Sequence, residues 1–460
     1  MNDCWDVIVI GAGMSGLGAG LRLALAGKKV LIVEQHNSIG GLNSFYLKDG
    51  IKYDVGLHAL TNFVPKGTKG HPLSKLCRQL RIPYEALLLE EQRMSSIQFP
   101  DITLNFTNDF QILLSEIERY FPEEKENFLK LDAAVENLSD TSLEGPHFIS
   151  ARAQLNDFIK DPLLKEMLLL PLFYYGSAHV NDLDWRQFAI LYKSIYREGF
   201  ARPQGGVRTL LKLLRDRFRE WGGTLKVKTK VDAIIFEKNS DKAIGVKLAS
   251  GEILHAQQML SSIGYCETQV LCGQKKVAKN PVLTFAETIS TIHCSPQQLG
   301  WEKTITFFNH SDKVDYSPSN QLLDLRSGVI CIPENYGNLN KAITTLRTTH
   351  LASYDAWLKL SHDEYLQKKK VCLDASRECA FKVLGGARNV SIEAEDMFTP
   401  LTIKRFTGHL NGAIYGSPEK YRDGRIGYQN VFLCGTDQGF LGIVGALLSG
   451  ISMANYHCLQ

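Results

Sequence analysis

The residues best suited to chemistry begin near the N-terminus, where three glycines and an acid are spaced around apolar runs. Gly11, Gly13 and Gly16 have the G-x-G-x-x-G spacing, and Glu34 ends the next apolar run. In a dinucleotide-binding βαβ unit the first glycine makes a tight turn, the second lets the backbone approach a pyrophosphate, and the third lets the helix pack closely. The acid accepts hydrogen bonds from ribose hydroxyls and repels a 2′-phosphate. The spacing therefore predicts a phosphate-binding loop for a dinucleotide.

The residues around these glycines predict the elements that must position them. The run from 7 to 10 is β-branched throughout, which is typical of a buried parallel strand. Residues 17–26 have the composition of a helix that Gly27 ends, and residues 29–33 form a second apolar strand. The phosphates are then expected at the N-terminus of that helix, where free N–H groups and the helix dipole favour anions.

The rest of the chain alternates between helical and strand patterns. Residues 76–195 carry apolar residues at helical spacing, so we expect a helical region there. Residues 224–264 indicate a meander of short strands, and residues 281–348 indicate four more strands before a helix at 363–384. Residues 430–457 again have the order strand, glycine-rich turn and helix.

Strand–turn–helix elements thus recur at 6–35, around 200–264 and at 430–457. We expect these separated pieces to build one cofactor-binding domain, while the inserts build a substrate domain of the α+β type. The predicted boundaries are 1–75, 196–270 and 395–460 for the first domain, and 76–195 and 271–394 for the second.

Length and composition narrow the classes of protein. With 460 residues, 44% of them hydrophobic, the chain can bury a large core in two domains. The net charge of +3 without long single-sign blocks gives no indication of nucleic-acid binding. Ten scattered cysteines without C-x-x-C pairs indicate a reducing compartment and no metal site. The βαβ unit at the start leaves no room for a signal peptide, and the longest apolar segments are too interrupted to span a bilayer. We expect a cytoplasmic protein, with peripheral contact to a membrane left open.

Motifs at both ends and in the middle of the chain resemble the FAD-dependent amine oxidase and phytoene desaturase superfamily. Within it they are most similar to the phytoene desaturase, carotenoid isomerase and retinol saturase branch. The motifs are "GAGMSGLGAG", "IGGLNSF", "YDVGLHAL", "RPQGGVRTLLKLL", "TPLTIKRFTGHLNGAIYG" and "LCGTDQGFLGIVGALLSG". The resemblance implies a Rossmann-like FAD-binding domain of the glutathione reductase or p-hydroxybenzoate hydroxylase type.

The resemblance also implies which residues hold FAD. Val231 matches the residue that presents its backbone to adenine, and the helix beginning at Gly442 points at the isoalloxazine ring. Leu42 departs from the pattern, because many relatives have Arg after the double glycine, so the pyrophosphate loses one cation. The implied FAD positions are Gly11, Gly13, Met14, Ser15, Gly16, Glu34, Gln35, Gly40, Gly41, Leu42, Val231, Gly435, Thr436, Asp437, Gly442, Ile443 and Val444.

His58 in "YDVGLHAL" falls where the family chain passes close to the flavin. It is a candidate catalytic residue, and the alternative is a histidine that holds the turn by bonding to the backbone. Arg405 and Tyr415 are candidates for the cavity wall, for the core or for a surface pair. The apolar stretch 168–176 fits either a tunnel wall or an ordinary buried helix end.

The interpretation that follows is an FAD-dependent oxidoreductase that desaturates, saturates or isomerises the C=C system of a hydrophobic polyene or isoprenoid. No second G-x-G-x-x-G unit is present, so electrons would be exchanged with an external partner such as O2, a quinone or a reductase. An amine or porphyrinogen oxidase is the alternative enzyme. A prenyl-chain carrier similar to the Rab GDP-dissociation inhibitors is the alternative outside enzymes, although such a carrier would need neither the phosphate loop nor Glu34.

Overall fold

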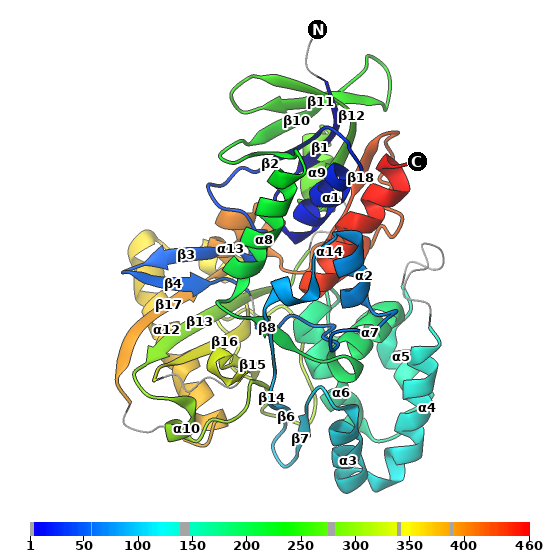
Figure 1. The fold of residues 1–460 in the computed structure, drawn as a ribbon. Coiled ribbons are helices and arrows are strands. Elements are labelled where there is room, and N and C mark those ends of the chain that lie inside the picture. The colour runs from blue at the N-terminus through cyan, green and yellow to red at the C-terminus, as the bar shows by residue number, and fades with distance from the viewer. Residues whose placement is uncertain (1–3, 57, 139–147, 275–280, 338–341, 387–389) are drawn as a thin grey trace.

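Two large β-sheets form the frame of the computed structural model, which describes residues 4–56, 58–138, 148–274, 281–337, 342–386 and 390–460 (Figure 1). The first sheet has the strand order β10-β11-β12-β1-β2-β9, with β18 paired to β12. Strands β18, β12, β1, β2 and β9 are paired in parallel, whereas β10 and β11 form an antiparallel edge. The strands are β1 (Trp5–Ile10), β2 (Val30–Val33), β9 (Thr224–Lys226), β10 (Val231–Phe236), β11 (Ala243–Leu248), β12 (Ile253–Ser261) and β18 (Val431–Leu433).

Helices from distant parts of the sequence pack on this sheet. Helix α14 lies along α1 in the upper half of Figure 1, and a Cβ atom at Gly450 would stand 1.9 Å from the carbonyl oxygen of Ser15. Only glycine allows the two helices this approach, which brings the C-terminal segment to the N-terminal loop. The helices of this part are α1 (Met14–Leu25), α2 (Pro72–Gln79), α8 (Val207–Glu220), α9 (Tyr265–Leu271) and α14 (Gly442–Met453).

The second sheet has the strand order β17-β13-β16-β15-β14-β6-β7 and is antiparallel except for the pair β14 and β6. The four strands predicted between 281 and 348 all belong to this sheet. The helix predicted at 363–384 is also present and packs beside the sheet. Its elements are β6 (Ser95–Gln98), β7 (Thr103–Phe106), β13 (Thr284–Ile292), α10 (Pro296–Leu299), β14 (Ile305–Asn309), β15 (Ser327–Cys331), β16 (Thr344–Ala352), α11 (Tyr354–Leu358), α12 (His362–Val383), β17 (Ile392–Phe398) and α13 (Pro400–Thr407).

Two elements depart from the sequence-based expectation. The region 76–195 is not wholly helical, because β6 and β7 join the second sheet and β5 (Leu89–Glu91) pairs with β8 (Ala201–Pro203). Strand β17 crosses the boundary expected at 394/395 and pairs with β13 over its length. The helices of the region are α3 (Phe110–Tyr120), α4 (Lys125–Glu136), α5 (Ala151–Leu155), α6 (Pro162–Gly176) and α7 (Trp185–Tyr192).

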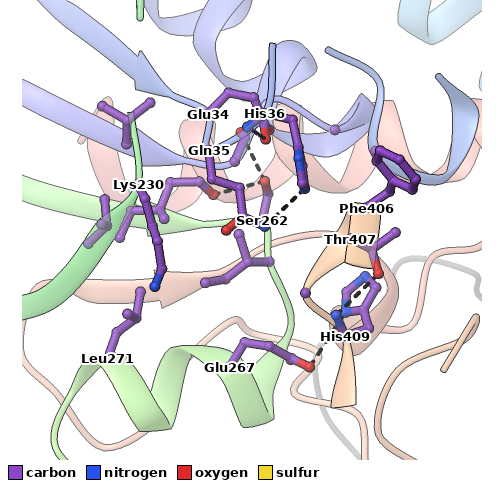
Figure 2. Close-up of a pocket in the computed structure, with 18 of the residues that line it drawn as sticks. Glu34, Gln35, His36, Lys230, Ser262, Glu267, Leu271, Phe406, Thr407 and His409 are labelled. Atoms are coloured by element: carbon purple, nitrogen blue, oxygen red, sulfur yellow. Dashed lines mark hydrogen bonds and ion pairs between the residues drawn. The ribbon is translucent and has the colours of Figure 1, made fainter. Parts of the chain in front are cut away.

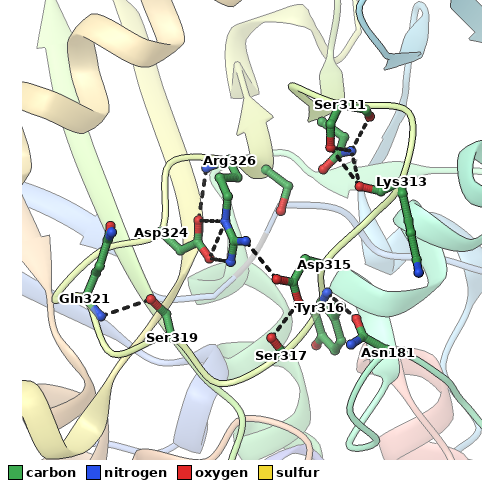
Figure 3. Close-up of polar contacts among 12 residues, drawn as sticks. Asn181, Ser311, Lys313, Asp315, Tyr316, Ser317, Ser319, Gln321, Asp324 and Arg326 are labelled. Atoms are coloured by element: carbon green, nitrogen blue, oxygen red, sulfur yellow. Dashed lines mark hydrogen bonds and ion pairs between the residues drawn. The ribbon is translucent and has the colours of Figure 1, made fainter.

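The segment between β14 and β15 fastens the second sheet to the helical region (Figure 3). The backbone N–H of Tyr316 donates to Asn181 Oδ1 at 2.6 Å, and the Asn181 N–H donates back to the Tyr316 carbonyl at 2.9 Å. Arg326 holds the far end of the segment through Asp324, with Nη2 2.6 Å from Oδ2. The ring of Tyr316 then packs edge-on against Tyr174, with centroids 5.7 Å apart. The loop thus holds the Tyr316 ring against Tyr174 at the end of α6.

A short hairpin of β3 (Phe45–Lys48) and β4 (Ile51–Asp54) projects from the body at the left of Figure 1. Its turn is Asp49-Gly50, a dipeptide typical of hairpin turns, and both residues have positive φ, 52° and 80°. Within the described residues, no helix combines the length and the apolar character needed to cross a membrane.

Candidate functional site

The loop between β1 and α1 has the shape that its glycines predict. Gly11 has a φ of +95°, a backbone conformation that favours glycine. A Cβ atom at Gly16 would stand 2.1 Å from the Gly11 carbonyl oxygen, so the first turn of α1 can pack against the loop only with glycine at position 16. At Gly13 an added Cβ would meet nothing within 4 Å. The loop is therefore packed tightly on the protein side and is open on the other side, where a pyrophosphate would lie.

Glu34 closes this loop from the end of β2. Its side chain is 8% exposed, and its two oxygens accept hydrogen bonds from the backbone N–H groups of Ala12 and His36, each at 2.9 Å. A carboxylate has about four lone-pair sites, so acceptor capacity remains for hydroxyl donors from the adjoining cavity. Glu34 is thus placed both to hold the loop and to accept from a ribose.

A cavity of about 850 Å³ adjoins the loop and is shown in Figure 2. Lys230 and Leu271 lie on its left in that view, and Phe406, Thr407 and His409 lie on its right. Seven of the predicted FAD positions line it: Gly11, Gly13, Glu34, Gln35, Gly41, Leu42 and Val231.

Sequence reasoning missed the wall formed by the segment 404–410. Glu267 on α9 accepts a hydrogen bond from the Leu410 N–H at 2.6 Å and lies 3.6 Å from His409 Nδ1. Burial lowers the pKa of His409, but the Glu267 carboxylate outweighs burial and raises it above its ordinary value. The available signal for Glu267 was the strand–turn–helix pattern at 253–271, because the segment that follows a parallel strand borders the dinucleotide site in such sheets.

A second cavity, of about 720 Å³, lies beyond the first. The two share six lining residues, which are Ser38, Gly41, Leu42, Ser44, Phe406 and Thr407. An extended dinucleotide needs two adjoining compartments of this kind, with its pyrophosphate near the junction. The residues present therefore fit FAD: the glycine loop would hold the ADP half, and the second cavity would accommodate the flavin half.

The N-terminus of α14 borders the second cavity. Its first residue, Gly442, has a φ of +70° and is close to Thr61, and its N-cap residue Leu441 offers no side-chain hydrogen bond to the free N–H groups. Such an end favours negative charge, as on the N1–C2=O side of a reduced flavin. Thr436 and Ile443, two of the predicted FAD positions, also line this cavity.

Seven predicted positions line neither of these two cavities: Met14, Ser15, Gly16, Gly40, Gly435, Asp437 and Val444. Asp437 is 2% exposed, and its carboxylate accepts from the N–H groups of Tyr265 at 2.6 Å and Ser417 at 2.7 Å. Its side chain therefore joins segments of the protein, and a contact with FAD would have to use its backbone. Gly40 likewise acts through its backbone, donating to the Ala12 carbonyl at 2.8 Å.

The wall of the second cavity is largely aromatic and aliphatic. Tyr174 and Tyr175 at the end of α6 line it, whereas residues 168–173 lie in the core, so the stretch 168–176 serves both roles. Tyr415 lines the cavity and donates to the Tyr174 carbonyl. Arg405 is exposed and its guanidinium lies over the Phe406 ring, which is the surface alternative among the three places considered for it.

His58 lies in the same cavity beside three polar residues that sequence reasoning did not single out. Its Nε2 is 3.2 Å from Thr349 Oγ1 and 3.5 Å from Glu287 Oε2. Arg347, behind Glu287, is 2% exposed and donates from Nε to Glu287 Oε1 at 2.8 Å. The bonds of the ring thus go to side chains rather than to the backbone.

The pKa of Glu287 follows from this arrangement. Burial raises it, but the charge of Arg347 and the hydrogen bond to His58 outweigh burial and lower it to about 2. The carboxylate is therefore ionised at neutral pH and acts as an acceptor only.

Curated relatives of the chain act on carotenoids by their names. Prolycopene isomerase 2 from an Oncidium hybrid cultivar is 24% identical, over 98% of this chain and 83% of the relative. The neurosporene-forming phytoene desaturase of Cereibacter sphaeroides is 27% identical over 57% of this chain and 53% of the relative.

Solved structures and a family model give the same general assignment. An oxidoreductase from Methanosarcina mazei has a TM-score of 0.65 at 16% identity, covering 98% of this chain and 99% of that one. A RAB GDI from Plasmodium falciparum has a TM-score of 0.55 at 13% identity, covering 100% and 97%. These likenesses show the fold. The model of flavin containing amine oxidoreductases matches residues 14–456. The chain therefore belongs to the family of flavin containing amine oxidoreductases and is an FAD-dependent oxidoreductase.

Proposed function

We propose that the chain acts on carbon–carbon bonds of a hydrophobic polyene or isoprenoid substrate, by desaturation, saturation or isomerisation. The observation that carries the proposal is the second cavity, whose lining combines an apolar wall with the N-terminus of α14. Its apolar lining includes Val55, Ala59, Tyr174, Tyr175, Phe285, Val329, Met397, Phe398, Ile414 and Tyr415. FAD, when bound, supplies hydride transfer, and an apolar wall of this kind excludes water from around a carbon substrate.

The similarity to a prolycopene isomerase along nearly the whole chain supports this substrate class. The phytoene desaturase similarity supports it as well, since both relatives are named for reactions of polyenes. Isomerisation and desaturation differ in the fate of the electrons, so the choice between them belongs to experiment.

The outer end of the second cavity is a suitable entrance for a lipid. Phe45 and Leu47 on the β3–β4 hairpin and Phe406 on α13 all line the cavity and are exposed to solvent. Lys48 is on the same hairpin and is partly exposed. Apolar side chains with basic neighbours are typical of interfacial contacts. We propose that this end rests on a membrane and takes up substrate there.

An amine oxidase is the alternative reaction class, because the family model carries that name. An ammonium substrate held by charge needs a carboxylate that no cation of the protein already neutralises. The two carboxylates that line the second cavity are each paired, Glu287 with Arg347 and Asp396 with Lys369 at 3.0 Å. Their charges are thus already balanced, which favours a neutral substrate.

The electron partner is proposed to be external, as O2, a quinone or a separate reductase. The test of the whole proposal is an anaerobic flavin spectrum of the purified holoenzyme, titrated with polyenes, isoprenoids and amines. We expect bleaching by a polyene or isoprenoid, or reoxidation of the pre-reduced enzyme by one. Turnover confined to amines would contradict the proposal and leave the FAD assignment intact.

A further inference from the structure

The polar corner of the second cavity is built by the register of two paired strands. Glu287 on β13 stands opposite Thr349 on β16, and Arg347 is two residues from Thr349 on the same face. Arg347 donates to Glu287 Oε1 through Nε and Nη2. A buried charge pair is stable only with good geometry and further hydrogen bonds, and here the second carboxylate oxygen faces His58.

The environment of His58 selects one tautomer. Glu287 is ionised and accepts only, so the Nε2 atom of His58 must carry the proton that faces it. The other nitrogen, Nδ1, has no hydrogen-bond partner among the described residues and is not among their buried, unpaired atoms. In neutral His58 the Nδ1 lone pair is therefore open to the cavity that the residue lines. A carboxylate that fixes one imidazole nitrogen so that the other accepts a proton is the arrangement of a general base.

We infer that His58 is a catalytic base that removes a proton from a substrate carbon through Nδ1, with Glu287 and Arg347 as its positioning residues. The inference rests on the proposed function and assigns a direction to it, namely desaturation. The substrate C–H bond breaks, its proton goes to Nδ1, and its electron pair forms the new C=C bond. The neighbouring carbon simultaneously gives up a hydride to oxidised FAD, so the substrate loses two hydrogens and the cofactor gains two electrons. Glu287 then stabilises the imidazolium.

The ionisable groups beside His58 have pKa values far from neutral pH. Burial raises the pKa of Tyr175 well above its ordinary value and that of Cys331 to about 12. Burial opposes the charge of Arg347, but Glu287 outweighs it and raises the Arg347 pKa further. The pKa of Glu287 is about 2, so these neighbours keep one protonation state at neutral pH and hold the geometry around His58 constant.

The first test needs no substrate. Holoenzyme with ¹⁵N-labelled histidine is compared with the same preparation of His58→Gln, which identifies the His58 resonances by their loss. We expect the neutral ring to carry its proton on Nε2. A proton on Nδ1 would overturn the inference whatever the reaction proves to be.

The second test measures flavin reduction by a polyene or isoprenoid in single turnovers. His58→Gln should slow it about 10²- to 10⁴-fold, while flavin absorbance per chain stays unchanged. Glu287→Gln leaves Arg347 buried without its partner and risks misfolding, so Thr349→Val is the second variant. It removes one partner of Nε2 and should slow reduction about three- to tenfold.

Thr348→Val is the matched control, because Thr348 is on the opposite face of β16 and its hydroxyl has no partner among the described residues. The flavin of Thr348→Val should be reduced at the wild-type rate. Reduction of the flavin of His58→Gln at that rate would overturn the base assignment and leave the proposed function standing. If no polyene or isoprenoid reduces the wild-type flavin but one reoxidises the pre-reduced enzyme, the base assignment fails and the proposed function stands.

Discussion

Two glycines of the N-terminal loop allow the cofactor's place to be tested apart from the fold. In Gly13→Ala the new methyl group meets nothing within 4 Å, and the residue's φ of −69° is one that alanine adopts readily. The apoprotein should unfold with unchanged free energy, or gain up to about 1 kcal/mol from a stiffer unfolded chain. In Gly16→Ala the methyl group would stand 2.1 Å from the Gly11 carbonyl oxygen, and overpacking of this kind costs about 1–3 kcal/mol or more.

The two variants should therefore give different results in a pair of assays. Urea denaturation of the apoprotein reports the fold, and a titration that follows flavin fluorescence reports FAD affinity. Gly13→Ala should bind FAD at least tenfold more weakly without loss of apoprotein stability, because its methyl group occupies space meant for the pyrophosphate. Gly16→Ala should lose both apoprotein stability and FAD affinity. If Gly13→Ala bound FAD as tightly as the wild type, the pyrophosphate could not lie over Gly13, and the placement argued from the open side of the loop would be refuted.

Three further outcomes are expected. Glu34→Ala removes the acceptor of two backbone N–H groups and of the ribose, so FAD affinity should fall at least tenfold in the same titration. Leu47→Glu, at a residue 65% exposed, should reduce cosedimentation with lipid vesicles, whereas Ile253→Glu, 48% exposed on β12, should not. The lowered pKa of Glu287 contributes stability above its ordinary value of 4.5 that is lost as the pH falls towards about 2. The free energy of unfolding of the wild-type protein, measured by urea denaturation, should consequently fall as the pH is lowered across that window.

Features that depend on neighbours along the chain were predictable. The first βαβ unit was predicted at 7–33 and lies at β1, α1 and β2, because β-branched strands, glycine turns and helix ends are set by local backbone preferences. The same holds for the hairpin turn at Asp49-Gly50 and for the helix at 362–383. The family and its cofactor were also predicted and are confirmed, since their motifs are short and contiguous.

Features that depend on register or on distant partners were not predictable. Strands β6 and β7 have four residues each and carry polar side chains, so the helical pattern on both sides of them dominated the prediction. Strands β13 and β16 were found as strands, but nothing in either pattern says that Glu287 and Thr349 stand opposite each other. Their meeting with His58, over 200 residues away in sequence, is a property of the sheet and of the loop packed against it.

The fold also explains why two motifs recognised far apart belong together. Asp54 in "YDVGLHAL" is buried, and its carboxylate lies 2.7 Å from Arg202 and 3.2 Å from Arg208, which flank the glycine turn before α8. A Cβ atom at Gly206 would stand 2.0 Å from Asp54 Oδ2, so the turn must be glycine for the acid to enter between the two arginines. This clamp holds the start of the segment that carries His58 against an element that packs on the cofactor sheet. Asp54 thus positions the chain that lines the second cavity, which is why it bears on the reaction although it lines neither cavity itself.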